Sequence, residues 1–240
     1  MNKYDLQQFH KDLEDFQIAL SSSQIDQFLT YYEMLVEKNK VMNLTAITDF
    51  DEVLKKHFID SLSLVKAGDL KGDISLLDIG TGAGFPGIPL KIAFPNLQVT
   101  LLDSLNKRIN FLQEVIDGLG LKNIEALHGR AEDFAKPNML REKFDFCVSR
   151  AVANLSTLSE YCLPYVKVGG YFVSYKSEKV SDEIVAADNS VKILGGKIEK
   201  QIGFTLPSSD ICRNLVMIRK CSKTPKQYPR KAGTASKKPL

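Results

Sequence analysis

Several residue types that carry chemistry are scarce in this chain of 240 residues. Tryptophan is absent, and the chain contains only three histidines and four cysteines. No two cysteines form a Cys-x-x-Cys pair, and no histidine lies at a ligand spacing from them. The sequence therefore predicts reduced thiols and no metal site. The cysteines are Cys147, Cys162, Cys212 and Cys221.

Long apolar runs are also missing. No stretch approaches the roughly 18 consecutive apolar residues that a membrane-spanning helix needs. The N-terminal segment 1–6 begins with mixed charge and lacks the apolar core of a signal peptide. Hydrophobic residues nevertheless make up 44% of the chain, which is enough for a buried core. We therefore expect a cytoplasmic, membrane-independent protein, and nothing in the sequence demands an oligomer, so we expect a monomer.

Acidic residues are absent from the last 21 positions. This segment, 220–240, holds seven of the 32 basic residues, so the rest of the chain has 25 basic against 29 acidic ones. The asymmetry favours a polyanionic partner, and a solvated tail without a partner is the alternative. The seven cations are Lys220, Lys223, Lys226, Arg230, Lys231, Lys237 and Lys238.

Two patterns divide the chain. Apolar residues at helical spacing fill residues 1–70, which predicts an N-terminal helical cap. Apolar runs and helical segments then alternate through residues 71–220, which predicts a parallel sheet covered by helices. The expected strands are 75–79, 98–102, 124–127, 144–149 and 171–175. The expected helices between them are 87–94, 106–119, 154–166 and 178–194, with a turn at 169–170.

The end of this region differs, because the strands 196–206 and 214–220 have only a turn at 207–210 between them. Such strands pair antiparallel. A mostly parallel, doubly wound sheet with a terminal antiparallel hairpin is the methyltransferase version of the α/β Rossmann-like fold. We therefore predict a methyltransferase domain at residues 71–220, followed by a basic tail at residues 221–240.

A glycine-rich loop follows the first expected strand and opens a helix. It reads Asp-Ile-Gly-Thr-Gly-Ala-Gly-Phe-Pro-Gly over residues 78–87. Its Gly82 and Gly84 also begin a Gly-x-Gly-x-x-Gly match, so a nicotinamide-binding protein is the alternative. Asp78 before the first glycine favours S-adenosylmethionine, because an acid there can pair with the ammonium group of this methyl donor. Pro86 crowds the helix start where a pyrophosphate needs free N–H groups.

Two further segments follow strands of the same sheet. Asp103 ends the second strand, where a carboxylate can accept both ribose hydroxyls of either cofactor. Ala131 and Glu132 follow the third strand, at a position that suits contact with an adenine. The alternative for this segment is a helix N-cap near Glu132 or Asp133.

The fourth strand ends in Ser-Arg-Ala-Val at 149–152, and no Asn/Asp-Pro-Pro-Tyr motif for amino methylation occurs there. A Pro-Cys nucleophile for attack on cytosine is also missing. Guanine N7 is an acceptor that needs neither motif, because its lone pair carries no proton. Alignment of N7 with the methyl group can then contribute about 7–11 kcal/mol to catalysis. Ribose or protein acceptors stay open. We expect Arg150 near the cofactor or guanine O6, with a salt bridge to Asp145 or Glu160 as the alternative.

Several motifs in fixed order resemble one family, the bacterial ribosomal RNA small subunit methyltransferase G family, also called glucose-inhibited division protein B. The resemblance runs from Asn43 to the C-terminus. The motifs are Asn-Leu-Thr-Ala-Ile at 43–47, His-x-x-Asp-Ser-Leu at 57–62, the loop at 78–90, Asp-Ser-x-x-Lys-Arg at 103–108, Arg-Ala-Glu at 130–132, Ser-Arg-Ala at 149–151 and Tyr-Pro-Arg-Lys-x-Gly at 228–233.

The resemblance implies methyl transfer from S-adenosylmethionine to N7 of one guanosine in 16S ribosomal RNA of the small subunit. Donor contacts are expected from Gly80, Gly82, Phe85, Asp103, Ala131, Glu132 and Arg150. Contacts to RNA are expected from Asn43, His57, Lys107, Arg108, Arg230 and Lys231, with no catalytic acid or base. A methyltransferase of small metabolites and an RNA-binding module without a cofactor are the remaining alternatives.

Overall fold

The computed structural model describes residues 4–150, 152–178 and 180–240; Ala151 of the Ser-Arg-Ala motif lies outside the described residues. The chain begins with two amphipathic helices, and Ser21 starts the second one by accepting a hydrogen bond from the Gln24 backbone in a capping box. A third helical stretch follows, with a π-helical middle. The bounds are α1 Gln7–Asp15, α2 Ser22–Asn39, α3 Phe50–Val53, the π-helix Leu54–Ile59, α4 Asp60–Leu62 and a 3₁₀ turn Ser63–Lys66.

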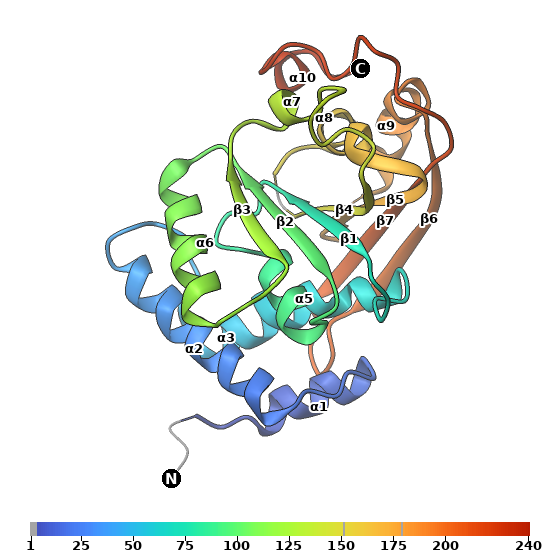
Figure 1. Cartoon of the computed structure of the whole chain (residues 1–240). Coiled ribbons are helices and arrows are strands. Elements are labelled where there is room, and N and C mark those ends of the chain that lie inside the picture. The colour runs from blue at the N-terminus through green and yellow to red at the C-terminus, as the bar shows by residue number, and fades with distance from the viewer. Residues whose placement is uncertain (1–3, 151, 179) are drawn as a thin grey trace.

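A seven-stranded sheet forms the centre of the molecule (Figure 1), with strand order β3-β2-β1-β4-β5-β7-β6. Strands β1–β5 pair parallel, while β7 runs opposite to all the others and pairs antiparallel with β5 and β6. This order and the closing hairpin confirm the predicted fold. The strands are β1 Ser75–Ile79, β2 Gln98–Asp103, β3 Ile124–His128, β4 Phe144–Arg150, β5 Val166–Lys176, β6 Gly196–Thr205 and β7 Cys212–Lys220.

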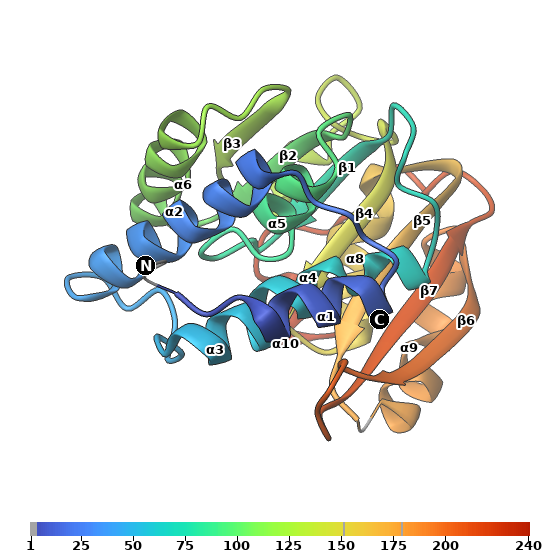
Figure 2. The same ribbon diagram turned by 90° about the horizontal axis from the view of Figure 1, so that it is seen from below.

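Helices cover both faces of the sheet. Side chains alternate between the faces along each strand, so Leu76 packs with the N-terminal helices while Leu77 packs against α8 and α9. Figure 2 shows α1, α2 and α3 on the same side as α5 and α6. The helices are α5 Gly87–Ala93, α6 Asn106–Gly118, α7 Ala131–Phe134, α8 Leu155–Cys162, a 3₁₀ turn Leu163–Tyr165, α9 Ser181–Ile193 and α10 Thr234–Lys237.

The described part of the N-terminal region, residues 4–70, shares one core with the sheet. Phe9, Phe28 and Leu35 of the first two helices are buried in the same cluster as strand residues of β1, β2 and β5. Tyr31 of α2 links these helices to the loop after β1, because its hydroxyl donates to the Ala83 carbonyl at 2.5 Å. The N-terminal helices therefore support the loop on which the predicted site is built.

Strand β5 corrects one prediction. Residues 169–170 were expected to form a turn before a short strand, but β5 begins already at Val166 and includes them. Gly169 has a φ of +95°, and the pairing with β4 shifts register between Phe144 and Phe146. The glycine pair therefore marks an irregularity inside a long strand, since glycine accepts a φ that other residues avoid.

The backbone of the basic tail is packed against the domain, although five of its seven cations, all but Lys220 and Arg230, are exposed. Arg141 donates to the carbonyls of Thr224 and Tyr228 at 2.6 and 2.7 Å. Lys220, counted among the tail cations, is completely buried, and its ammonium group donates to the Leu163 carbonyl at 2.7 Å. Figure 1 shows the chain returning from β7 to α10 beside α7 and α8.

Candidate functional site

Asp78 fixes the shape of the loop after β1. This carboxylate is fully buried, and its Oδ2 accepts from the Thr81 hydroxyl at 2.7 Å and the Gly87 N–H at 2.9 Å. Its Oδ1 has no hydrogen-bond partner within the part of the chain that the structure describes, and burial raises the pKa of Asp78 to about 6. Asp78 therefore closes the loop onto helix α5, a role that the sequence reading did not assign to it.

Two glycines give the loop its path. Gly80 has a φ of +69° and Gly82 a φ of +63°, in the left-handed region that side chains disfavour. A Cβ on Gly80 would lie 2.5 Å from Cγ2 of Val152, so no larger residue fits there without movement. The glycines thus keep backbone exposed at the carboxyl end of the sheet, where open α/β folds bind ligands.

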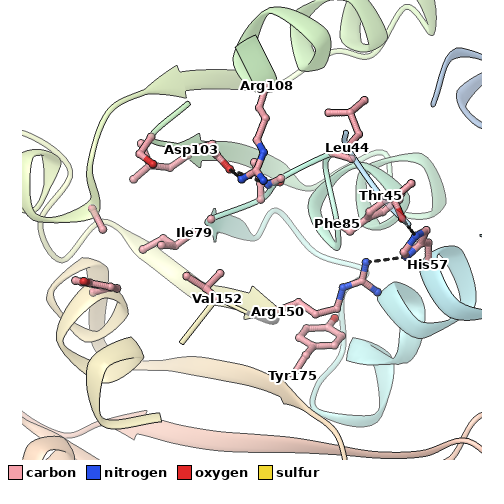
Figure 3. Close-up of a pocket in the computed structure, with 18 of the residues that line it drawn as sticks. Leu44, Thr45, His57, Ile79, Phe85, Asp103, Arg108, Arg150, Val152 and Tyr175 are labelled. Carbon is pink, nitrogen blue, oxygen red and sulfur yellow. Dashed lines mark hydrogen bonds and ion pairs between the residues drawn. The ribbon is translucent and has the colours of Figure 1, made fainter. Parts of the chain in front are cut away.

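Asp103 ties the loops after β1 and β2 together. Its Oδ2 accepts from the Gly82 N–H at 3.0 Å and from Nη1 of Arg108 at 3.1 Å, while Oδ1 accepts from the Leu105 N–H at 2.9 Å. Arg108, expected to contact RNA, lies within the site as the ion-pair partner of Asp103 (Figure 3). Lys107 is exposed beside it at the start of α6.

Arg150 at the end of β4 joins a cluster that the sequence reading only partly foresaw. Its Nη1 donates to Oδ2 of the buried Asp60 at 2.9 Å, and the guanidinium lies 5.1 Å from the centre of the Phe85 ring. The expected alternative partners, Asp145 and Glu160, are wrong, because they pair with Lys167 and Arg230.

Arg213 of β7 completes this cluster. Its Nε donates to the second oxygen of Asp60 at 3.1 Å, so one buried carboxylate holds two arginines at the cavity wall. Sequence reasoning missed Arg213, since β7 is more than sixty positions from β4 and carries no recognisable motif. The only available signal was its place near the start of a predicted strand beside the sheet's carboxyl edge.

His57 lies between Arg150 and Thr45. Its ring stacks on Phe85 with centroids 4.5 Å apart, and its Nδ1 lies 3.4 Å from Nη2 of Arg150. An arginine can only donate, so Nδ1 is the acceptor and Nε2–H donates to the Thr45 hydroxyl at 2.8 Å. Burial, and then the charge of Arg150, lower the pKa of His57 to about 4, which makes the ring neutral at physiological pH.

Asn43 lies apart from this arrangement. It is exposed, and the cavity wall near it consists of Leu44, Thr45 and Ile47 instead. Figure 3 shows Thr45 pointing toward His57 across the end of the cavity. The motif at 43–47 therefore contributes to the cavity through these three residues and not through Asn43.

The tail forms part of the site at the opposite end. The Gly233 N–H donates to Oε1 of Glu132 at 2.8 Å, and Ser236 also lines the cavity. The carbonyl of Ala131 accepts from the Tyr165 hydroxyl. Lys231 is exposed, whereas Arg230 is held in an ion pair with Glu160. Of the two expected RNA contacts in the tail, Arg230 is therefore directed inward.

These elements surround one cavity of about 1040 Å³ along the carboxyl ends of β1, β2, β4 and β5. All seven predicted donor-contact residues line it, as do His57 and Arg108. An elongated methyl donor with a ribose, an adenine and a charged amino-acid end fits the groups that line this cavity. These groups are the open glycine backbone, the Asp103 carboxylate and the Arg150 cation. Among the described residues, no group of three or more metal-ligating side chains occurs.

The fold and the site define a class of protein. Rossmann-like methyltransferases that use S-adenosylmethionine have a sheet of strand order 3-2-1-4-5-7-6 in which β7 is antiparallel. They also have a glycine loop after β1 and an acid at the end of β2, which here is Asp103. The nicotinamide-binding alternative is thereby set aside, because its sheet continues with parallel strands. A methyltransferase of known structure from Aquifex aeolicus, described as dependent on the same donor, has this fold at a TM-score of 0.53 and 20% identity, over 76% of this chain and 97% of that one.

The chain belongs to the family described as rRNA small subunit methyltransferase G, whose model matches residues 24–215. It is 56% identical to the ribosomal RNA small subunit methyltransferase G of Lachnoclostridium phytofermentans, over 97% of this chain and 96% of that protein. The protein of the same name from Clostridium beijerinckii is 50% identical over the full length of both chains. The resemblance found in the sequence motifs is thus confirmed. Among the described residues, no helix is long and apolar enough to cross a membrane.

Proposed function

We propose that this protein transfers the methyl group of S-adenosylmethionine to N7 of one guanosine in 16S ribosomal RNA, acting as a monomer in the cytoplasm. Family membership supports the ribosomal RNA substrate. The observation that carries the choice of acceptor atom is the state of the four carboxylates in the cavity wall. Each already accepts hydrogen bonds from protein groups: Asp60, Asp103, Glu132 and Glu183.

This engagement favours an acceptor that needs no deprotonation. An amino or hydroxyl target must lose a proton in the course of the transfer, and a general base within hydrogen-bond reach assists that loss. Guanine N7 has a free lone pair in the ring plane, so the residues have only to align it with the methyl group and the sulfur. The bound donor supplies an electrophilic methyl group, and the protein supplies orientation and exclusion of water.

The Arg150 cluster suits such a reaction. N7 becomes cationic on transfer, so a bare guanidinium beside it would oppose the reaction. Asp60 neutralises part of the charge of Arg150 and Arg213, and the Phe85 ring lies against the guanidinium of Arg150. We propose that Arg150 contacts the donor or guanine O6, and that neutral His57 keeps it in place.

The other predicted residues are assigned by their position. We propose that the donor contacts are Gly80, Gly82, Phe85, Asp103, Ala131, Glu132 and Arg150. Contacts to the phosphates are assigned to the exposed Lys107 and Lys231 and to the cavity rim, where Arg108 and the His57 segment lie. Asn43 stands outside the cavity, so any contact of Asn43 is with RNA beyond the target nucleotide.

The test combines purified protein, labelled methyl donor and small subunits from a strain that lacks the enzyme. Mapping the labelled nucleotide is expected to give a single N7-methylguanosine in 16S RNA. Parallel reactions with free 16S RNA and with a pool of small metabolites provide the comparison. Label in protein, in metabolites or on a ribose hydroxyl would reject the proposal.

A further inference from the structure

The C-terminal segment from Thr224 to Leu240 reaches the cofactor cavity and is anchored next to it by an ion pair between the buried Glu160 and the partly exposed Arg230. We propose that this segment is a structural part of the methyl-donor site, and that the Glu160–Arg230 pair is the positioning device that holds Gly233 against Glu132. The inference rests on the proposed function, because it assigns the adenine end of the cavity to the donor. It gives Arg230 a role different from the RNA contact expected from the sequence.

The anchor is a carboxylate in the core. Glu160 of α8 is 0% exposed, and it accepts from the Arg230 backbone N–H at 2.7 Å and from Nε at 2.9 Å. The guanidinium also donates to Oε2 of Glu160 and, through the same Nη2, to the Lys238 carbonyl at 2.8 Å. A buried charge needs such a partner, since an unpaired one is strongly destabilising.

The ion pair fixes both ends of the short segment from Arg230 to Lys238. Arg230 binds Lys238 across the helix α10, so the residues between them form a closed loop over α8. Ala235 inside this loop is 1% exposed, and its carbonyl accepts from the Thr157 hydroxyl at 3.2 Å. The loop is therefore a packed element whose position depends on Glu160.

Gly233 transmits this position to the cavity. It lies three residues after Arg230, has a φ of +79° and donates its N–H to Oε1 of Glu132 at 2.8 Å. Glu132 lines the cavity on the segment after β3, and Gly233 and Ser236 form the wall beside it. The tail thus sets the direction of the carboxylate that is assigned to the adenine.

Three variants and one control separate positioning from stability. Arg230→Met leaves Glu160 charged and unpaired, so it is expected to lower the melting temperature and to weaken S-adenosylmethionine binding about tenfold by calorimetry. Adding Glu160→Gln removes the unpaired charge and should recover most of the melting temperature, while donor binding stays weak. Gly233→Val places a β-branched side chain at a φ of +79°, so it should move the Gly233 N–H away from Glu132 and weaken donor binding while Arg230 and Glu160 stay unchanged. Lys226→Gln, an exposed change in the same segment, should leave donor binding unchanged.

The KM values give a second readout. For Arg230→Met with Glu160→Gln, the KM for the donor should rise while the KM for RNA stays near that of the wild type. Recovery of donor affinity together with the melting temperature in the double variant would show a merely structural pair and overturn the proposal. Unchanged donor affinity with weaker RNA binding would overturn it in favour of an RNA contact. Absence of donor binding in the wild type would instead refute the proposed function.

Discussion

Asp60 offers a quantitative test of the arginine cluster. It is 4% exposed and accepts from Nη1 of Arg150 at 2.9 Å and from Nε of Arg213 at 3.1 Å. Asp60→Asn keeps the shape but turns one acceptor into an NH₂ group that faces a guanidinium, which has only donors. Breaking a buried ion pair costs about 3–5 kcal/mol, and the neighbouring cavity admits water, so we expect about 3 kcal/mol.

In a chain of this length each kcal/mol shifts the melting temperature by about 2–4 °C, so the expected fall is about 6–12 °C. Thermal unfolding followed by circular dichroism at neutral pH measures it. Asp73→Asn is the matched control, because it removes the same charge from an exposed loop position before β1. Methyl transfer should also fall by about tenfold or more, since Arg150 loses a charge-assisted hydrogen bond. A melting temperature within about 2 °C of both wild type and control would refute the reasoning.

Three further predictions test other parts of the site. Gly80→Ala should abolish donor binding, because its Cβ would meet Val152 at 2.5 Å, whereas Gly120→Ala, with a φ of +63° and open surroundings, should show only the backbone strain. Burial lowers the pKa of His57 from 6.5 to about 4, so as the pH falls the unfolded chain takes up a proton before the folded chain does. The folded state therefore loses stability between pH 6.5 and about pH 4, and His57→Gln should reduce this loss in melting curves measured across that range. Lys107→Gln should weaken RNA binding and reduce its salt slope by about one, with donor binding unchanged in calorimetry.

The strands of the sheet were predictable because their apolar residues are contiguous in sequence. The predicted starts of β1, β2, β3, β4 and β6 and the predicted ends of β1 and β7 agree with the structure, and the other bounds, apart from the start of β5, differ by one or two residues. The start of β5 was missed, because Gly169 inside it has the signature of a turn. Val166 pairs with Phe144 of β4 and so extends the strand beyond this glycine, and such a neighbour cannot be read from the local sequence.

The glycine loop, the acid at the end of β2 and the Arg at the end of β4 were also readable from the sequence. Parallel strands place their carboxyl ends at one edge, so residues that follow successive strands meet without further information. The partners of these residues were not readable. Asp60 belongs to the motif at 57–62 in the N-terminal helices and Arg213 to the terminal hairpin, and nothing at either position indicates that Asp60 pairs with Arg150 and Arg213.

The tail shows most clearly what the sequence leaves open. Its charge indicated a polyanionic partner. In the structure the segment also buries Ala235, pairs with Glu160 and lines the cavity. Deletion of residues 221–240 would therefore damage the cavity as well as any contact with RNA, so point variants of exposed tail cations are the sharper test of RNA binding.

The sequence by itself determined the class of fold, the order of its elements and the family, since these depend on local periodicity and on motifs of neighbouring residues. Tertiary structure alone decided which charges are neutralised, which of them face the cavity and which cations are left for RNA. The physical reason is that an ion pair forms between atoms a few ångströms apart in space, and residues such as Glu160 and Arg230 reach that distance only after the chain has folded.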